Sequence, residues 1–387
     1  MKLPPALLET WMRDYYFRAE IDIGSSGVED FSFAEVRALL GIECADLDAV
    51  LLCDSETMGG RGLREALARR WAGGDAGRVM ATHGSSEANF LLMTALLHPG
   101  DEVLVLDPCY PQLFAIAQAM GCRIRRWPLR LENGFRPDLD ELRALLTPAT
   151  RMVVANFPHN PTGATLTPAE QRALIDAVSA AGAYLVWDGA FAEMTYDTPP
   201  LPEPSLLYER AISMGTLSKG YGLPGLRVGW CLASPQVLGQ MMGVRDYVTL
   251  HLSPLVELVA KRVIEEADRI VGMRMEVAAR NRRLVGEWME AHREWVRWVP
   301  PAGGVSAFPF FPGVPDTEAF CRTLADEQGV LLVPGECFGA PGFARLGFGR
   351  ATETVREGLG RLSAGLRRHV EGRRGARPPR EAVAAAP

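Results

Sequence analysis

Short apolar runs alternate with helical patterns through the middle of the chain, and this alternation limits the fold more than any other feature. The runs are rich in Val, Leu, Ile and Met, as is typical of strands buried on both faces. Strands that alternate with helices favour a mostly parallel sheet between helical layers, an α/β fold whose ligands gather beyond the carboxyl ends of the strands. The expected strands are 79–82, 102–106, 151–156, 184–187, 211–214 and 228–232, with helices such as 112–120 and 167–181 between the later ones.

Periodicity and composition divide the chain into four segments. We predict an N-terminal arm over residues 1–45 that contributes to a small domain, and a large α/β domain over 46–252. A long connecting helix, interrupted at Gly272, then leads into the rest of a smaller α+β domain, and together they span 253–370. Residues 371–387 are rich in Pro, Gly, Arg and Ala, a composition that predicts a disordered tail.

The charge and the cysteines limit the class of protein. The net charge is −6 at pH 7 and the arginines are scattered except near the C-terminus, which argues against a nucleic-acid-binding surface. Seven dispersed cysteines with no metal-ligand spacing favour a reducing cytoplasm. The N-terminus lacks the features of a signal peptide, and no run reaches the roughly 18 apolar residues of a membrane span. We therefore expect a cytoplasmic protein with no metal, nucleic-acid or membrane partner.

Lys219 is the leading candidate for a covalent catalyst. It lies in a polar, glycine-rich loop between two buried apolar runs, where a functional site is more common than a simple connection. Only three of the 41 basic residues are lysines, and a Schiff base needs a primary amine that guanidinium cannot replace. The other two are Lys2, at the terminus, and Lys261, in an amphipathic helical pattern typical of a solvated charge.

The loop around Lys219 resembles the cofactor-lysine motif of the class I and II aminotransferases, which bind pyridoxal 5′-phosphate (PLP) in fold type I. It runs Thr216-Leu-Ser-Lys219 and continues as Gly225-Leu-Arg227-Val-Gly229. The resemblance implies that Lys219 binds PLP covalently and that Thr216 and Arg227 contact its phosphate. It also implies an aspartate-aminotransferase-like fold and a homodimer with its active sites at the subunit interface.

A second segment predicts more of the phosphate site. Thr82-His-Gly84-Ser85-Ser86 lies between an expected strand and a helix. Small residues let the backbone approach an anion, hydroxyls donate hydrogen bonds, and the helix N-terminus adds partial positive charge. Gly-Ser-Ser alone is equally an ordinary turn and capping sequence. The resemblance assigns Gly84, Ser85 and Ser86 to the phosphate.

Three residues at expected strand ends match the family's contacts with the pyridine ring. Tyr110, in Asp-Pro-Cys-Tyr-Pro, corresponds to the aromatic residue that stacks on the ring. Asn160, in Asn-Pro-Thr-Gly, corresponds to the hydrogen-bond donor to O3′. Asp188 ends a strand, where a carboxylate keeps the ring nitrogen protonated and the ring electron-withdrawing. A core tyrosine, a turn and a helix cap explain each residue singly, but not their order along the chain.

The chain departs from the family pattern at two positions. Where the family has Asp-x-x-Tyr, this chain has Asp188-Gly-Ala-Phe191, so one hydroxyl donor to O3′ is lost. Where the family often has a tyrosine that contacts phosphate across the dimer interface, this chain has Asp54. Both differences argue against an ordinary transaminase site.

The resemblance also places the substrate. Arg345 matches the family's C-terminal arginine, which binds the substrate α-carboxylate with a bidentate contact. Gly27 lies in the N-terminal segment that closes over the same carboxylate.

Other segments resemble, in more detail, the PLP cyclases of viomycin-type and streptothricin-type antibiotic pathways. These are Ser25-Ser-Gly-Val28, Asn156-Phe-Pro-His-Asn-Pro161 and the segment from Trp187 to Phe191, together with the phosphate and lysine motifs. The implied substrate is 3-hydroxyarginine or 3,4-dihydroxyarginine, and the implied product is capreomycidine or hydroxycapreomycidine. Lys219 would remove the α-proton, the β-hydroxyl would leave, and a guanidino nitrogen would add to Cβ.

A cyclase of this kind needs an acidic group to hold the substrate guanidinium. Glu29 and Asp30 follow Gly27 directly and are our candidates, although loop acids are as commonly just solvated. His251 is a candidate acid for the leaving hydroxyl, or a structural histidine.

Three other functions are compatible with parts of this pattern. A plain aminotransferase that uses a 2-oxo acid would share all the cofactor residues, and an arginine-oxidising PLP enzyme would share most of them. A PLP-fold transcription regulator would need an appended DNA-binding domain, whereas here the fold motif begins near residue 1.

Overall fold

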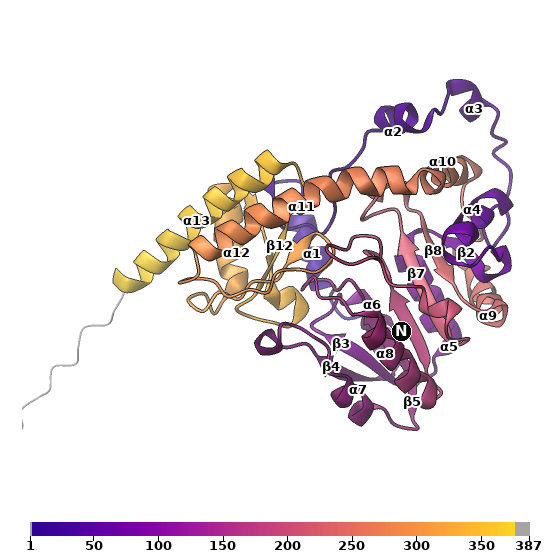
Figure 1. Ribbon diagram of the computed structural model, residues 1–387, viewed down its shortest axis with the longest axis horizontal. Coiled ribbons are helices and arrows are strands. Elements are labelled where there is room, and N and C mark those ends of the chain that lie inside the picture. Colours follow the sequence, from indigo (N-terminus) through magenta and orange to yellow (C-terminus); the bar gives the residue numbers. More distant parts are fainter. Residues whose placement is uncertain (1, 376–387) are drawn as a thin grey trace, which may run out of the picture.

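A seven-stranded sheet forms the centre of the protein in the computed structural model, which describes residues 2–375 (Figure 1). The strand order is β2-β8-β7-β6-β5-β3-β4. Strands β4, β3, β5, β6 and β7 run parallel, whereas β8 is antiparallel to β7 and β2, so the predicted mostly parallel α/β sheet is confirmed. The strands are β2 Val79–Thr82, β3 Glu102–Asp107, β4 Arg123–Pro128, β5 Thr150–Asn156, β6 Tyr184–Asp188, β7 Ala211–Thr216 and β8 Gly229–Leu232.

The sequence did not predict β4. This strand carries Arg123, Arg125 and Arg126, and most of its side chains are partly or fully exposed. It lies at the edge of the sheet, where one side of the strand has no neighbour to bury it. An edge strand therefore lacks the apolar run that identifies the central strands.

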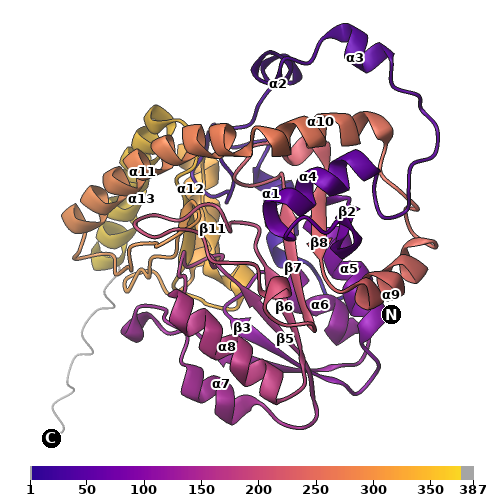
Figure 2. The same cartoon turned by 45° about the vertical axis from the view of Figure 1, so that its right-hand side comes forward.

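Helices cover the sheet on both faces, so that every residue of β2, β7 and β8 is buried (Figure 2). The α5 helix packs against β2, β7 and β8, while α8 packs against β6. The helices of this layered region are α4 Arg61–Trp71, α5 Gly84–Leu96, α6 Gln112–Ala119, α7 Leu139–Leu145, α8 Pro168–Ala180 and α9 Pro235–Arg245, with short 3-10 turns at η1 Ala76–Arg78, η2 Leu131–Asn133, η3 Pro204–Leu206 and η4 Pro224–Leu226.

The N-terminal segment and the C-terminal region fold together. Strand β1 pairs in parallel with β10, and a separate antiparallel sheet has the order β11-β12-β9. The elements are α1 Leu7–Tyr15, β1 Ile21–Asp22, α10 Pro254–Glu265, α11 Ala267–Ala291, β9 Ser306–Ala307, α12 Thr317–Gln328, β10 Val330–Leu331, β11 Val333–Pro334, η5 Gly335–Phe338, β12 Ala344–Gly347 and α13 Thr352–Gly375.

The long helical pattern is interrupted at Glu266, not at Gly272 as predicted. Glu266 has φ −106° and ψ 18°, outside the helical region, and separates α10 from α11. Gly272 lies inside α11 with open space where a Cβ would be. A single glycine weakens a helix by only about 1 kcal/mol, and packing of α11 against α13 outweighs that effect.

Two regions extend from the body. Helices α2 Phe33–Leu40 and α3 Cys44–Asp48 stand away from it in both ribbon views (Figures 1 and 2). At the other end α13 continues to Gly375, past the predicted start of the tail at 371, and residues 376–387 lie outside the described part of the chain.

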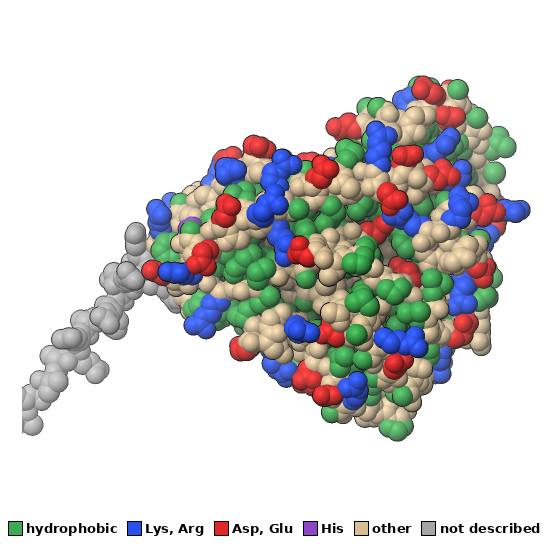
Figure 3. All heavy atoms as spheres, viewed as in Figure 1, with side chains coloured by type: hydrophobic (Ala, Val, Ile, Leu, Met, Phe, Trp, Pro, Cys, Tyr) green, Lys and Arg blue, Asp and Glu red, His purple; other side chains and the backbone are tan. Residues whose placement is uncertain are grey.

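The surface and the cysteines of the described residues offer few further candidate functional sites. On the face in Figure 3, acidic and basic side chains are interspersed, with no broad basic area of the kind nucleic acids bind. Within residues 2–375, no helix is long and apolar enough to cross a membrane, no acidic, His or Cys cluster could hold a metal ion, and all seven cysteines are free.

Candidate active site

A cavity of about 480 Å³ lies where the carboxyl ends of the central strands meet the N-terminal segment and β12. The central sheet contributes Tyr110 after β3, Asn160 after β5, Asp188 at the end of β6, and Thr216 and Lys219 at and after the end of β7. Residues far away in sequence complete it, among them Glu9, Ser26, Gly27, Asp30, Arg345 and Arg350. The structure therefore brings together most of the predicted site residues.

Lys219 is one of the residues that line this cavity. Its Nζ donates a hydrogen bond to Oγ of Ser26, at 3.1 Å. Burial, reinforced by the positive charge of Arg345, lowers the pKa of the Lys219 amine from 10.5 to about 8. Such an amine loses its proton close to neutral pH, as a nucleophile or a general base requires.

The loop that carries Lys219 is fixed by its own polar residues. The Thr216 hydroxyl donates to the carbonyl oxygen of Val228 at 3.1 Å and accepts from the amide of Ser218 at 3.1 Å. Arg227 donates through Nη1 to the Pro224 carbonyl at 2.9 Å, and its φ of 52° is unusual for a residue with a side chain. Strained backbone of this kind concentrates at functional sites, where the surrounding structure holds it in place.

The start of α5 and Arg227 form a compact anion cradle. Gly84 has φ +73°, a backbone conformation that favours glycine, and a Cβ there would lie 2.7 Å from Nη2 of Arg227. A Cβ at Gly229 would lie 2.5 Å from the carbonyl carbon of Gly84. The hydroxyls of Ser85 and Ser86 line the cavity beside them. Helix N-terminal amides, hydroxyls and one guanidinium are the donors that a phosphate needs.

Asp188 is buried at the base of the cavity. Burial raises its pKa to about 6, opposed by a hydrogen bond from the Ala190 amide at 3.0 Å and by the charge of Lys219. The side chain of Asn156 supports this strand end, because its Nδ2 donates to the Asp188 carbonyl at 2.8 Å and its Oδ1 accepts from the Asn160 amide at 2.7 Å. A buried carboxylate of this kind stabilises a positive charge placed beside it.

Arg345 is buried on β12 with only 3 % of its surface exposed. Its Nε donates to the Gly24 carbonyl at 3.0 Å and its Nη1 to Oδ1 of Asn160 at 3.3 Å. Burial lowers its pKa to about 10, so it remains a cation at neutral pH. A fixed guanidinium at the cavity wall suits a carboxylate ligand.

The predicted guanidinium-binding acids do not match the cavity equally. Asp30 lines it, but is paired with Nη1 of Arg350 at 3.0 Å. Glu29 is not among the lining residues, and its Oε2 accepts a hydrogen bond from the Ala351 amide at 2.9 Å. Gly27 does line the cavity, as predicted for the closing segment.

The two departures from the family pattern lie in different surroundings. Phe191 lines the cavity, is 3 % exposed, and has its ring centre 5.9 Å from Nζ of Lys219. Asp54 is fully exposed and pairs with Nε2 of His251 at 3.1 Å. Neither Asp54 nor His251 lines the cavity, so the structure does not place His251 near a leaving hydroxyl.

Among the cavity residues that were not predicted as site residues, Ser26 and Glu9 make notable contacts. Ser26 belongs to a predicted motif but had no role of its own, and its contact with Lys219 links positions 193 residues apart. Glu9 lies in an amphipathic helix, and nothing in its local sequence distinguishes it from a solvated acid. Its carboxylate accepts a hydrogen bond from the Tyr110 hydroxyl at 2.6 Å. Burial and the Glu9 charge together raise the pKa of Tyr110.

The residues present fit PLP. The cradle at Gly84 and Arg227 suits its phosphate, Asp188 suits the ring nitrogen, and Lys219 would supply the amine for its aldehyde. Tyr110 lines the same cavity.

Comparisons with known proteins agree with this assignment. Residues 56–362 match the family model "Aminotransferase class I and II". The chain is 47 % identical over 376 residues to capreomycidine synthase of Streptomyces vinaceus, covering 96 % of each protein. It is 33 % identical over 320 residues to the arginine–pyruvate transaminase AruH of Pseudomonas aeruginosa, covering 80 % of this chain and 81 % of the transaminase.

A solved structure shows the same similarity. The crystal structure of the PLP-dependent cyclase OrfR superposes with a TM-score of 0.90 at 47 % identity, covering 95 % of this chain and 98 % of that one. The resemblance of the sequence to PLP cyclases is therefore confirmed, as are the fold and the cofactor.

Proposed function

Because the chain belongs to the class I and II aminotransferase family, we propose that this PLP-dependent enzyme is a cyclase of hydroxylated arginine. It eliminates the β-hydroxyl of 3-hydroxyarginine, or of 3,4-dihydroxyarginine, and closes a guanidino nitrogen onto Cβ. The product is capreomycidine or hydroxycapreomycidine. The similarity to capreomycidine synthase along almost the whole chain carries this proposal.

The residues of the cavity support the chemistry. PLP, when bound, withdraws electrons from the substrate α-carbon. The Lys219 amine, with its pKa near 8, is suited to remove the α-proton and later to return it. Arg345 holds the α-carboxylate. The atoms balance without a second substrate: the Cα–H and Cβ–O bonds break, water leaves, the N–Cβ bond forms with loss of a proton, and Cα regains one.

Mass spectrometry of the PLP-loaded protein tests this function. Incubation with 3-hydroxyarginine alone should give a product lighter by one water and containing a cyclic guanidine. The Lys219→Arg variant, which retains the charge but no primary amine, is the matched control and should give none. If 3-hydroxyarginine remains unchanged while the dihydroxylated substrate cyclises, the substrate assignment narrows to the latter.

An aminotransferase is the alternative function, favoured by the similarity to an arginine–pyruvate transaminase. It would need an oxo acid and would not lose water. Incubation with arginine and pyruvate distinguishes the two, because amino transfer to pyruvate without cyclisation of hydroxyarginine would contradict the cyclase.

We also propose a homodimer, in which a second copy covers the projecting segment near α3. Leu51 and Leu52, which follow α3 closely in sequence, are 77 % and 80 % exposed. Large apolar side chains so exposed commonly mark a protein interface. Light scattering should give twice the mass of the chain, and Leu51→Asp with Leu52→Asp should lower it to that of a monomer.

A further inference from the structure

The cavity carries three carboxylates, and their partners differ. Asp188 lies at the base, where the pyridine nitrogen of PLP would need it. Asp30 pairs with Arg350 at 3.0 Å, and Arg350 also pairs with Asp22 at 3.1 Å. Asp188 is therefore reserved for the cofactor, and the charge of Asp30 is already balanced by Arg350.

Glu9 is the third carboxylate, and no basic side chain of the described chain forms an ion pair with it. Its hydrogen-bond partner is the hydroxyl of Tyr110, which donates to Oε1 at 2.6 Å. A carboxylate has room for several donors, so this contact leaves most of its hydrogen-bonding capacity unused. Its charge acts on both Lys219 and Arg345 across the cavity.

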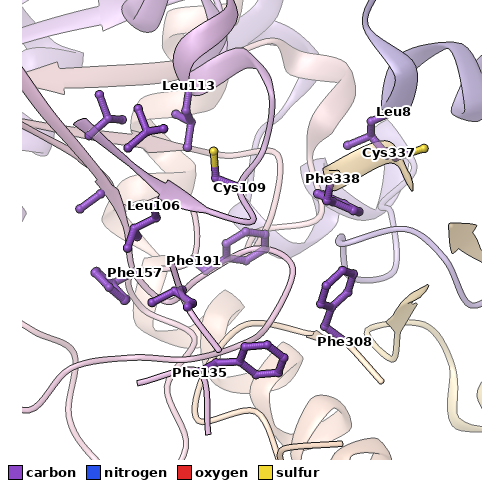
Figure 4. Close-up of a cluster of buried hydrophobic side chains, with 14 of the residues drawn as sticks. Leu8, Leu106, Cys109, Leu113, Phe135, Phe157, Phe191, Phe308, Cys337 and Phe338 are labelled. Atoms are coloured by element: carbon purple, nitrogen blue, oxygen red, sulfur yellow. The ribbon is translucent and has the colours of Figure 1, made fainter. Parts of the chain in front are cut away.

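The helix that carries Glu9 is firmly held. Leu8 and Trp11 are 4 % and 5 % exposed, and the Trp11 indole N–H donates to the Leu332 carbonyl at 2.9 Å. Figure 4 shows Leu8 beside Cys337 and Phe338 of η5, against which α1 packs. These contacts fix the position of Glu9, which lies between Leu8 and the cavity residue Met12 in sequence.

The charges of the cavity match a molecule with two opposite ends. Arg345 offers a cation for a carboxylate, and Glu9 offers an anion in the same cavity. We propose that Glu9 binds the guanidinium of the substrate, so that the enzyme selects amino acids with a cationic side chain. This inference rests on the proposed function and replaces Glu29 and Asp30 as the acids for that task. A charge-assisted, two-pronged contact with guanidinium is stronger than a neutral one.

Ligand binding tests this role without requiring turnover. The absorbance of the PLP-loaded protein is followed during titration with L-arginine and with L-citrulline, its uncharged counterpart of similar shape, in the absence of an oxo acid. The original protein should bind arginine at least about tenfold more tightly than citrulline. Glu9→Gln should reduce this preference by about 10- to 100-fold and leave the amount of bound PLP unchanged.

Two further variants make the test specific. Asp14→Asn removes an acid from the exposed side of the same helix and should leave the preference for arginine intact. Glu9→Asp retains the negative charge and should therefore retain part of the preference for arginine. A Glu9→Gln protein with its full content of PLP and an undiminished preference for arginine would overturn the proposal.

The two proposals fail in different ways. If the preference for arginine depends on Glu9 but 3-hydroxyarginine is not cyclised, Glu9 still binds the guanidinium and the cyclase assignment is wrong. If cyclisation occurs and the preference survives in Glu9→Gln, the cyclase stands and the role of Glu9 is wrong.

Discussion

The two ends of the cavity are built in different ways. The proposed cofactor end, formed by Gly84, Asp188, Thr216, Lys219 and Arg227, comes from strand ends and loops of the central sheet and from the start of α5. The substrate end, formed by Glu9, Ser26 and Arg345, comes from the N-terminal segment and β12. The hydrogen bond from Arg345 to Gly24 joins residues 321 positions apart. The cofactor end thus depends on local backbone, and the substrate end on the docking of distant segments.

Because the two ends are built separately, a substitution at one end should impair that end and leave the other functional. The largest effect is expected at the cofactor end. Lys219→Arg retains a cation but cannot form a Schiff base, so the rate of cyclisation should fall by about a thousandfold or more. The measurement is the turnover rate together with borohydride reduction, which should fix PLP to the original protein and not to the variant.

Lys261→Arg is the matched control, because Lys261 is a partly exposed residue of α10 that pairs with Glu265 at 3.3 Å. It should retain the full rate and the reducible link to PLP. Reduction that still fixes PLP to Lys219→Arg would show that another lysine carries the cofactor.

The next effect isolates the substrate end. Arg345→Lys replaces a buried, two-pronged donor with a single point charge, so KM should rise by about 10- to 100-fold. The amount of bound PLP should not change, because the residues of the cofactor end are unaltered and lysine retains the positive charge of Arg345. Arg356→Lys, on the exposed side of α13, should leave both quantities unchanged. A loss of PLP from Arg345→Lys would show that the two ends are not separable.

The same difference explains what the sequence could predict. Gly84, Asp188 and Lys219 follow apolar runs closely, so the alternation of strands and helices is enough to place them at one edge of the sheet. Their close approach is then a consequence of strand order. The motif around Lys219 could be identified because it, too, closely follows an apolar run in the sequence.

The substrate end was harder to predict because its contacts are set by tertiary packing. Glu9 is placed by the packing of Leu8 and Trp11, which a helical pattern alone does not reveal. The prediction for Glu29 and Asp30 depended on their closeness to Gly27 in sequence, yet a nearby amide and arginine bind them. Where distant segments meet, closeness in sequence is a poor guide to which side chains bind the substrate.

The third effect concerns the stability that the protein loses by burying Lys219 at the cofactor end. At pH 7 the apoprotein must bury the cationic amine of Lys219, whose pKa is lowered from 10.5 to about 8. Lys219→Met removes this penalty and should raise the free energy of unfolding by about 2 kcal/mol, a value reduced because the Lys219 side chain keeps some contact with solvent.

The pH dependence of this stability difference tests whether the buried charge of Lys219 is its cause. Between pH 8 and pH 10.5 the unfolded chain binds the proton of Lys219 and the folded chain does not, so the stability of the original protein rises with pH. The advantage of Lys219→Met in guanidinium unfolding should therefore shrink over that interval. An advantage that is constant with pH would point to better packing of methionine instead.

The smallest effect concerns Phe191, which distinguishes this cofactor end from the usual family pattern. Its ring lies 5.9 Å from Nζ of Lys219 and offers no hydroxyl to O3′ of PLP. Phe191→Tyr supplies one, and an ordinary hydrogen bond of about 1 kcal/mol corresponds to slightly less than one pKa unit. A donor to O3′ favours the deprotonated form, so the pH midpoint of the absorbance change of lysine-bound PLP should fall by up to about one unit. The rate of cyclisation should change by less than about tenfold, because the substrate end is untouched.

Phe33→Tyr, at an exposed position of α2, is the control. A midpoint that does not move in Phe191→Tyr would mean that the ring of residue 191 is not directed at O3′, and the cofactor end would then differ from the family in geometry and not only in one hydroxyl.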